Sequence, residues 1–142
     1  MILVDTSAWI DFFRGSGPLA DDTAEAIEEN AAALCGPVFT ELLRGFANEA
    51  SRENFRDLAS GCHWLDAPGD LWEEAGELGA GLRGAGVTAS TVDLLITTYA
   101  LAHRVPLLTG DKDFKSIAAA GVPLVVLDKQ ERRPQRRRRP EK

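Results

Sequence analysis

The sequence contains few residues that bind soft metals or act as thiol nucleophiles. Its 142 residues include two cysteines, Cys35 and Cys62, and two histidines, His63 and His103. Their positions do not match the spacing of a zinc site, and the Cys62-His63 pair lacks an acidic third partner. We therefore expect neither zinc nor cysteine nucleophilic catalysis, and we interpret both thiols as small buried side chains of a reducing compartment.

Long apolar runs are also missing. No run approaches the roughly 20 residues needed to span a bilayer, and no basic segment precedes an apolar one at the N-terminus. Hydrophobic residues nevertheless make up 44% of the chain. At this length they can form the core of one domain without a disulfide or a structural metal. We expect a soluble cytoplasmic protein that does not associate with membranes.

Basic residues are scarce over most of the chain and concentrated at its end. Residues 1–128 contain eight Lys or Arg against 20 Asp or Glu, whereas residues 129–142 contain eight against two. The net charge of −6 therefore combines an acidic body with a basic tail. We expect one domain over 1–128 and a disordered tail over 129–142. The tail is interpreted as an RNA-binding segment, as a solvated extension or as a segment that folds back on the body.

Short apolar runs alternate with helical patterns along the chain. This alternation is typical of α/β proteins, in which crossover helices join parallel strands. Strands are expected over residues 1–4, 33–36, 62–65, 105–109 and 124–127. Helices are expected after residue 5, from about 19 to 30, and over 37–46, 49–60, 71–82, 91–104 and 114–120.

Two aspartates follow apolar strands directly. Asp5 comes after the first strand, and Asp111 follows the fourth after one glycine. If both strands are central and parallel, these carboxylates lie at the same edge of the sheet, where α/β proteins bind ligands. Each aspartate also suits a helix N-cap, and Asp66 and Asp128 show that the pattern is common.

Asp93 occupies an unusual position in a helix that is apolar on nearly every side. Asp93 and Thr97 share its one narrow polar stripe. Because such a helix is normally buried, we expect Asp93 inside the protein or at the wall of a cleft. An aspartate in the first turn is also favoured by the helix dipole alone.

The sequence pattern around Glu41 does not indicate a functional site. The residue lies on the flank of the 37–46 helix, away from the centre of its apolar face, and Arg44 follows three positions later. Periodicity by itself predicts a solvated surface glutamate paired with this arginine.

Four short segments, each containing one of these acidic residues, carry a family resemblance. They are Ile2-Leu3-Val4-Asp5-Thr6-Ser7-Ala8-Trp9-Ile10, Thr40-Glu41-Leu42-Leu43-Arg44-Gly45, Thr91-Val92-Asp93-Leu94-Leu95-Ile96 and Leu107-Leu108-Thr109-Gly110-Asp111-Lys112-Asp113-Phe114. In this order and spacing they resemble the four motifs of PIN-domain ribonucleases, in particular VapC-type toxins of bacterial toxin–antitoxin pairs. One motif alone would be weak, but four over residues 1 to about 128 are specific.

The resemblance implies a fold and a reaction. The fold is a three-layer α/β/α PIN-like domain with a central, mostly parallel sheet of about five strands in the order 3-2-1-4-5. The implied function is that of a Mg²⁺-dependent endoribonuclease, with Mn²⁺ as a possible substitute, that cleaves RNA phosphodiesters with metal-activated water. The implied catalytic and metal-binding residues are Asp5, Glu41, Asp93 and Asp111.

Further residues and partners follow from the same resemblance and from chemistry. Carboxylates without His or Cys match a hard, oxygen-preferring cation. Thr6, Ser7 and Thr109 are candidates to hydrogen-bond a ligand carboxylate or a metal-bound water, and Asp113 is a possible supporting residue. N-capping and strand packing also explain these three hydroxyls. The expected partners are an RNA substrate, a cognate VapB-type antitoxin and a second copy of the chain in a homodimer.

Two other function classes remain as alternatives. A non-catalytic module with a PIN-like fold would bind RNA or protein, although all four acidic positions are occupied here. Another α/β phosphohydrolase is the second alternative. Haloacid dehalogenase-type phosphatases need an aspartate two positions after the first, where this chain has Ser7, and no glycine-rich phosphate loop follows a strand.

Overall fold

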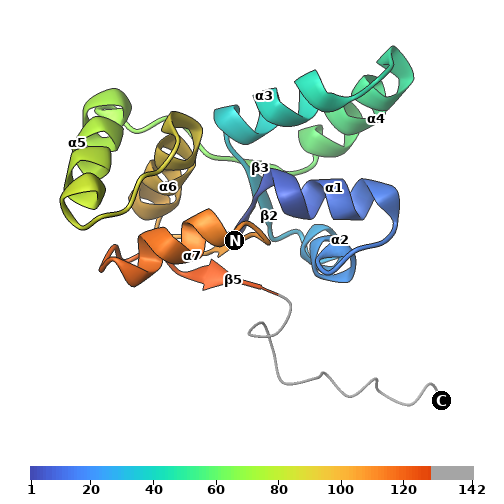
Figure 1. The fold of residues 1–142 in the computed structure, drawn as a ribbon. Helices are drawn as coiled ribbons and strands as arrows, with labels where there is room; N and C mark the ends of the chain where they lie inside the picture. The colour runs from blue at the N-terminus through green and yellow to red at the C-terminus, as the bar shows by residue number, and fades with distance from the viewer. Residues whose placement is uncertain (129–142) are drawn as a thin grey trace.

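The computed structural model describes residues 1–128, and its centre is a five-stranded parallel sheet (Figure 1). The strand order is β3-β2-β1-β4-β5, as the resemblance predicted. The strands are β1 (Ile2–Val4), β2 (Ala32–Leu34), β3 (His63–Trp64), β4 (Leu107–Leu108) and β5 (Val126–Leu127). All four neighbouring pairs are parallel, including β1 with β4.

Seven helices flank this sheet within residues 1–128. They are α1 (Thr6–Arg14), α2 (Ala20–Glu28), α3 (Gly36–Gly45), α4 (Glu49–Ser60), α5 (Leu71–Gly84), α6 (Thr91–His103) and α7 (Lys112–Ala119). Each expected helix is present. Helix α7 begins two residues earlier than expected, because the Asp111 side chain caps it by accepting a hydrogen bond from the Asp113 N–H.

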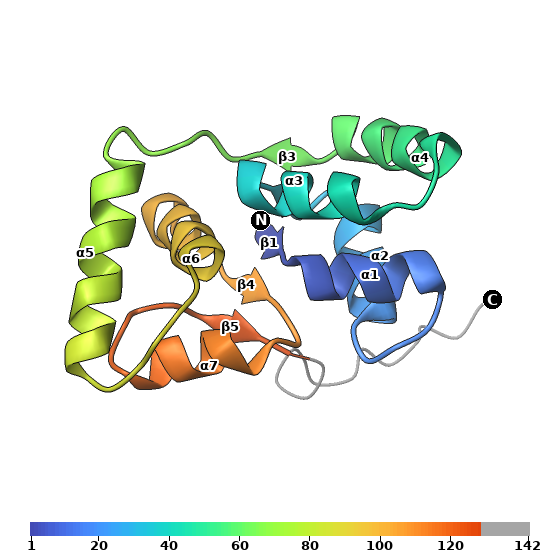
Figure 2. The ribbon, with the colours of Figure 1, turned by 45° about the horizontal axis from the view of Figure 1, so that its top comes forward.

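The chain adds strands first on one side of β1 and then on the other. From β1 it moves to β2 and β3, and it then returns to β4 and β5 on the other side of β1. Right-handed crossovers therefore place the two sets of helices on opposite faces. Figure 2 shows α1, α2 and α4 on one side of the strands and α5 and α6 on the other. The result is a three-layer α/β/α fold whose switch point lies between β1 and β4.

The packing around β1 fixes where its carboxyl end lies. Leu3 and Val4 are fully buried in the middle of the sheet. The indole N–H of Trp9 in α1 donates to the carbonyl oxygen of Val4 over 3.1 Å. The Trp9 ring contacts Phe13 and Phe55 with centroids 6.0 and 6.2 Å away, which joins α1 to α4. Buried aromatic rings thus hold the first turn of α1 in place next to β1.

Helix α6 is less deeply buried than its sequence predicted. Residues 96–100 are buried, but Val92, Leu94 and Leu95 in the first turns are only half-buried. These turns pack beside α5, where a Cβ at Gly79 would lie 2.8 Å from Leu94 Cδ1. Gly79 thus makes room for the end of the Leu94 side chain, and the N-terminal turns of α6 stay near the surface.

Two other expectations concern the ends and the surroundings of the domain. Within residues 1–128, no helix combines the length and the apolar character that a membrane crossing requires. The basic tail over 129–142 lies outside the described residues, so the expected boundary at residue 128 stays a prediction.

Candidate active site

Asp5 lies at the carboxyl end of β1 and is 4% exposed. It occupies the N-cap position of α1, but its side chain does not cap that helix. One carboxylate oxygen, Oδ2, instead accepts hydrogen bonds from Ser7 Oγ at 3.1 Å and Thr109 Oγ1 at 2.7 Å. The N-cap explanation therefore does not account for this side chain, whose orientation is set by two hydroxyl groups.

The same two hydroxyls connect the loops that follow β1 and β4. Ser7 Oγ accepts a hydrogen bond from the Gly110 N–H at 3.1 Å, and Thr109 Oγ1 accepts one from the Asp111 N–H at 3.0 Å. The two hydroxyl oxygens are 3.3 Å apart. This network links Asp5 to the main chain next to Asp111, so the ends of β1 and β4 are positioned together.

Glu41 lies on α3 and faces α1. Its Oε1 accepts a hydrogen bond from Thr6 Oγ1 at 3.0 Å, and the residue is half-buried. The surface location and the Arg44 pairing that periodicity predicted are wrong, since Arg44 is exposed and no ion pair within residues 1–128 joins the two. The helical pattern of α3 contains no information about α1, which packs against this flank.

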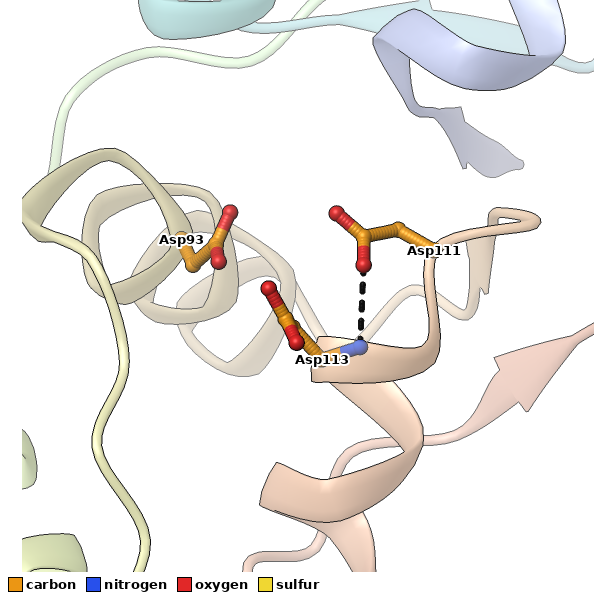
Figure 3. A group of neighbouring side chains, drawn as sticks. All are labelled: Asp93, Asp111 and Asp113. Carbon is orange, nitrogen blue, oxygen red and sulfur yellow. Dashed lines mark hydrogen bonds between the residues drawn. The ribbon is translucent and has the colours of Figure 1, made fainter.

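Three carboxylates from two helices form a compact group (Figure 3). Asp93 lies in the first turn of α6, and Asp111 and Asp113 lie at the start of α7. Each offers one oxygen, and these oxygens all lie within 4.8 Å of one another. The Asp113 N–H donates to Asp111 Oδ1 over 2.9 Å, so Asp111 caps α7 and faces Asp93 at the same time.

The electrostatics of the site favour protonation of its buried carboxyl groups. Burial, together with the charges of Asp111, Asp113 and Asp5, raises the pKa of Asp93 to about 6, although a hydrogen bond with Ser90 opposes this shift. Burial also raises the pKa of Asp5, although hydrogen bonds from Thr109, Thr6 and Ser7 oppose this shift. Without a cation, the site therefore holds its negative charges at a cost in free energy.

The structure brings the expected acidic residues together in two neighbouring parts. Asp93, Asp111 and Asp113 form the compact group, whereas Asp5 and Glu41 lie beside it, each held by hydroxyl groups. Asp113, which the sequence indicated only as a supporting residue, belongs to the compact group. Its place in the segment that resembles the fourth family motif was the signal in the sequence for this role.

The other two aspartates that follow strands, and the two histidines, lie outside the compact group of carboxylates. Asp66 and Asp128 follow the edge strands β3 and β5, and Asp128 pairs with Lys115. The ring of His103 contacts the Asp66 carbonyl oxygen at 2.7 Å, and that of His63 contacts the Asn30 carbonyl oxygen at 2.8 Å.

The two thiols are poor nucleophiles. Cys35, at the end of β2, is fully buried, and burial raises its pKa to about 12. Cys62 is half-buried, and burial raises its pKa as well. Both side chains are therefore protonated at neutral pH, which leaves too little thiolate for nucleophilic chemistry.

Comparisons with known proteins agree with this geometry. The PIN domain family model matches residues 2–120. The chain is 32% identical over 123 residues to ribonuclease VapC11 of Mycobacterium tuberculosis and to the VapC ribonuclease Mb1587 of Mycobacterium bovis. In both cases the match covers 83% of this chain and 92% of the relative.

Solved structures share the fold. VapBC-1 from nontypeable Haemophilus influenzae matches with a TM-score of 0.69 and 20% identity over 92% of this chain and 100% of that chain. VapBC2 from Rickettsia felis, bound to a DNA fragment from its promoter, matches with a TM-score of 0.67 and 22% identity. The match covers 89% of this chain and 98% of that chain. Family model, curated relatives and fold agree, and this chain belongs to the PIN domain family, as a relative of the VapC ribonucleases.

Proposed function

We propose that this chain is a metal-dependent endoribonuclease that acts as the toxin of a toxin–antitoxin pair. The convergence of Asp93, Asp111 and Asp113 next to Asp5, at the carboxyl ends of two adjacent parallel strands, carries the proposal. The VapC relatives, which are named as ribonucleases, support RNA as the substrate.

The donor atoms of the site fit Mg²⁺, with Mn²⁺ as a substitute. All of them are carboxylate oxygens, which hard cations prefer, and three of the carboxylates already lie within 4.8 Å of one another. Asp93 and Asp111 would hold the cation together with Asp5 and Glu41, and Asp113 supports them. A divalent cation would stabilise the charged form of Asp93, whose pKa is raised by burial and by the neighbouring carboxylates.

The residues of the chain orient the reaction. When bound, Mg²⁺ supplies Lewis-acid stabilisation of the phosphate charge and lowers the pKa of the attacking water. Ser7 and Thr109 hold the Asp5 carboxylate in one orientation, and Thr6 does the same for Glu41. This prior positioning reduces the reorganisation that the acidic groups undergo when they receive a cation and a substrate.

Nuclease assays on purified variants test the proposal. With Mg²⁺ the wild-type chain is expected to cleave RNA, and EDTA is expected to stop the cleavage. Asp5→Asn and Asp93→Asn are each expected to lower kcat by about a hundredfold or more while the circular dichroism spectrum is unchanged. Asp57→Asn, which removes an exposed carboxylate on α4, is the control and should cleave like the wild type. Full metal-dependent cleavage by both site variants, in preparations free of host nuclease, would contradict this mechanism.

The same assays separate the alternative functions. A non-catalytic module would bind RNA without cleaving it in either Mg²⁺ or Mn²⁺. Another phosphohydrolase would release phosphate from a monoester such as p-nitrophenyl phosphate, and we expect no such release. RNA binding without cleavage, or phosphate release without RNA cleavage, would replace the present proposal.

The proposed protein partners are a cognate VapB-type antitoxin and a second copy of the chain. The matching structures from Haemophilus influenzae and Rickettsia felis are VapBC structures, which supports the antitoxin. The antitoxin is expected to inhibit RNA cleavage when added in equimolar amount. Analytical ultracentrifugation of the chain alone is expected to show a dimer.

A further inference from the structure

A cavity of about 650 Å³ lies beside the acidic site, and Glu41 belongs to both. Its wall is formed by α3, the loop of residues 67–69, the start of α5 and α6. A second cavity of about 460 Å³ lies around Val105 and Pro106, at the opposite ends of the strands, and contains none of the acidic site residues. The larger cavity is thus the one that a substrate bound at the carboxylates can reach.

The larger cavity has the composition of a ligand pocket. Pro37, Pro68 and Leu95 are among its apolar wall residues, and few of the groups that line it are polar. Pockets of roughly 300 to 1,000 Å³ with apolar walls and a few polar groups typically bind small organic molecules. The volume of about 650 Å³ is ample for one nucleotide unit of an RNA strand.

Trp72 supplies an aromatic face at this cavity. Its side chain is 76% exposed, the largest exposed fraction among the big apolar side chains of residues 1–128. The residue lies in the first turn of α5, directly after the loop that forms part of the wall. An exposed indole next to a cavity is a typical stacking platform for an unpaired base.

Tyr99 supplies a hydrogen-bonding group at the wall of the cavity. The residue is 6% exposed and lines the cavity, yet its hydroxyl has no hydrogen-bond partner within residues 1–128. The hydroxyl oxygen lies beside Gly36, another residue of the wall, at 3.7 Å from the position that a Cβ there would take. Burial raises the pKa of Tyr99, so the hydroxyl is protonated at neutral pH and can donate.

Arg44 adds a positive charge at the same cavity. The described body of the chain is strongly acidic, with eight Lys or Arg against 20 Asp or Glu. Arg44 is exposed, lines the cavity and forms no ion pair with another of the described residues. A guanidinium in this position suits a phosphate of the RNA backbone.

We propose that this cavity binds one base of single-stranded RNA next to the phosphate that is cleaved. Trp72 stacks on the base, the Tyr99 hydroxyl hydrogen-bonds its edge, and Arg44 contacts the neighbouring phosphate. The inference rests on the proposed function, because it takes RNA as the substrate of the acidic site. Glu41 connects the two sites, so the base and the cleaved bond belong to adjacent nucleotides. Trp72 and Tyr99 are thereby specificity residues of the nuclease.

The first experiment measures sequence preference. A random-sequence single-stranded RNA library is cleaved in Mg²⁺ by the wild type, Trp72→Ala and Tyr99→Phe, and the new ends are sequenced. The wild type is expected to prefer one base at a position beside the cut. Trp72→Ala should raise KM about tenfold, and Tyr99→Phe should flatten the preference at that position alone. Trp64→Ala is the matched control, because Trp64 is 53% exposed on β3 and outside the cavity.

The second experiment measures base binding without cleavage. The four nucleoside 5′-monophosphates are titrated in Mg²⁺ while tryptophan fluorescence is recorded. Quenching that differs among the bases is expected for the wild type and for Trp64→Ala, and it should be lost in Trp72→Ala. This readout does not depend on catalysis, so it still tests the base pocket if the wild type cleaves no RNA.

The outcomes separate the two proposals. An unchanged KM in Trp72→Ala and an unchanged base preference in Tyr99→Phe, together with active wild-type cleavage, overturn the base pocket and leave the nuclease function intact. Trp72-dependent quenching without any RNA cleavage supports the pocket and overturns the nuclease function. If both variants keep the base preference but escape inhibition by the antitoxin, the cavity is a protein-docking site and the base pocket is wrong.

Discussion

Each acidic residue of the site has a different physical environment. Asp5 is almost fully buried and is held by two hydroxyls, whereas Asp113 is exposed and Asp93 lies between these extremes. Asp93 has a pKa of about 6, because burial removes part of its hydration and because it faces three other carboxylates. The free energy that it costs to keep a carboxylate charged without a cation therefore differs from one residue of the site to another.

Asp93 should make the stability of the metal-free protein dependent on pH. Folding raises its pKa from 3.8 to about 6. The protonated form of Asp93 is thus favoured in the folded state. Its stabilising contribution to the free energy of unfolding is complete below pH 3.8 and is lost as the pH rises through 6. We expect Asp93→Asn to be more stable than the wild type at pH 7.5 and equally stable at pH 3.5.

Urea denaturation in EDTA at both pH values measures this difference. Asp57→Asn, the exposed carboxylate on α4, controls for the loss of one negative charge. If Asp93→Asn gains the same stability over the wild type at both pH values, then repulsion and burial of this carboxylate do not cause the gain.

At the scale of elements, the site depends on how two strand–helix connections are joined. Thr109 is fully buried at the end of β4 and takes part in hydrogen bonds with Asp5 and the Asp111 N–H. Thr109→Val keeps the shape of the side chain but removes the acceptor of the Asp111 N–H and leaves Asp5 Oδ2 with the Ser7 hydroxyl alone. We expect kcat for RNA cleavage to fall by about tenfold to a hundredfold and the free energy of unfolding to fall by about 1 to 3 kcal/mol.

A second buried threonine is the matched control for this variant. Thr23 on α2 is also fully buried, and its hydroxyl donates to the carbonyl oxygens of Leu19 and Ala8, away from the acidic residues. Thr23→Val should lose stability but retain kcat. If the two variants lose equal activity, the effect of Thr109 is a general loss of packing and the positioning of Asp5 is not involved.

At the scale of the whole molecule, a cation at the acidic site should stabilise the packing of the helices that supply its ligands. Helix α6 and helix α7 contribute the three grouped carboxylates, so a bound Mg²⁺ stabilises the folded chain by mass action. With Mg²⁺ at ten times its Kd, we expect the Tm to rise by about 5 °C for a domain of this size. Asp93→Asn should show a smaller rise. An unchanged Tm in millimolar Mg²⁺ would argue against a preformed cation site.

The charge distribution leads to a separate prediction about RNA binding. The last fourteen residues carry eight Lys or Arg, and the preceding 128 are strongly acidic. If the tail contacts RNA phosphates, deletion of residues 129–142 should weaken RNA binding and flatten its dependence on salt. Filter binding at several salt concentrations measures the slope, and an identical slope for both chains would favour a solvated tail.

The sequence by itself determined the elements and the place of two carboxylates. Apolar runs and helical periodicity are local patterns, so they predicted the strands and helices, and they placed Asp5 and Asp111 directly after β1 and β4. The strand order needed the family resemblance, because pairing between strands is not a local property. The same resemblance indicated Glu41, which periodicity assigned to the surface.

Only the tertiary structure decided which of these groups meet. The right-handed crossovers bring α6 against α7 and α3 against α1, and this packing joins Asp113 to Asp93 and Glu41 to Thr6. The cavity with Trp72 and Tyr99 arises in the same way, from elements far apart in the chain. A helical pattern records which side of a helix is buried, but contacts between distant segments depend on how the whole chain crosses the sheet.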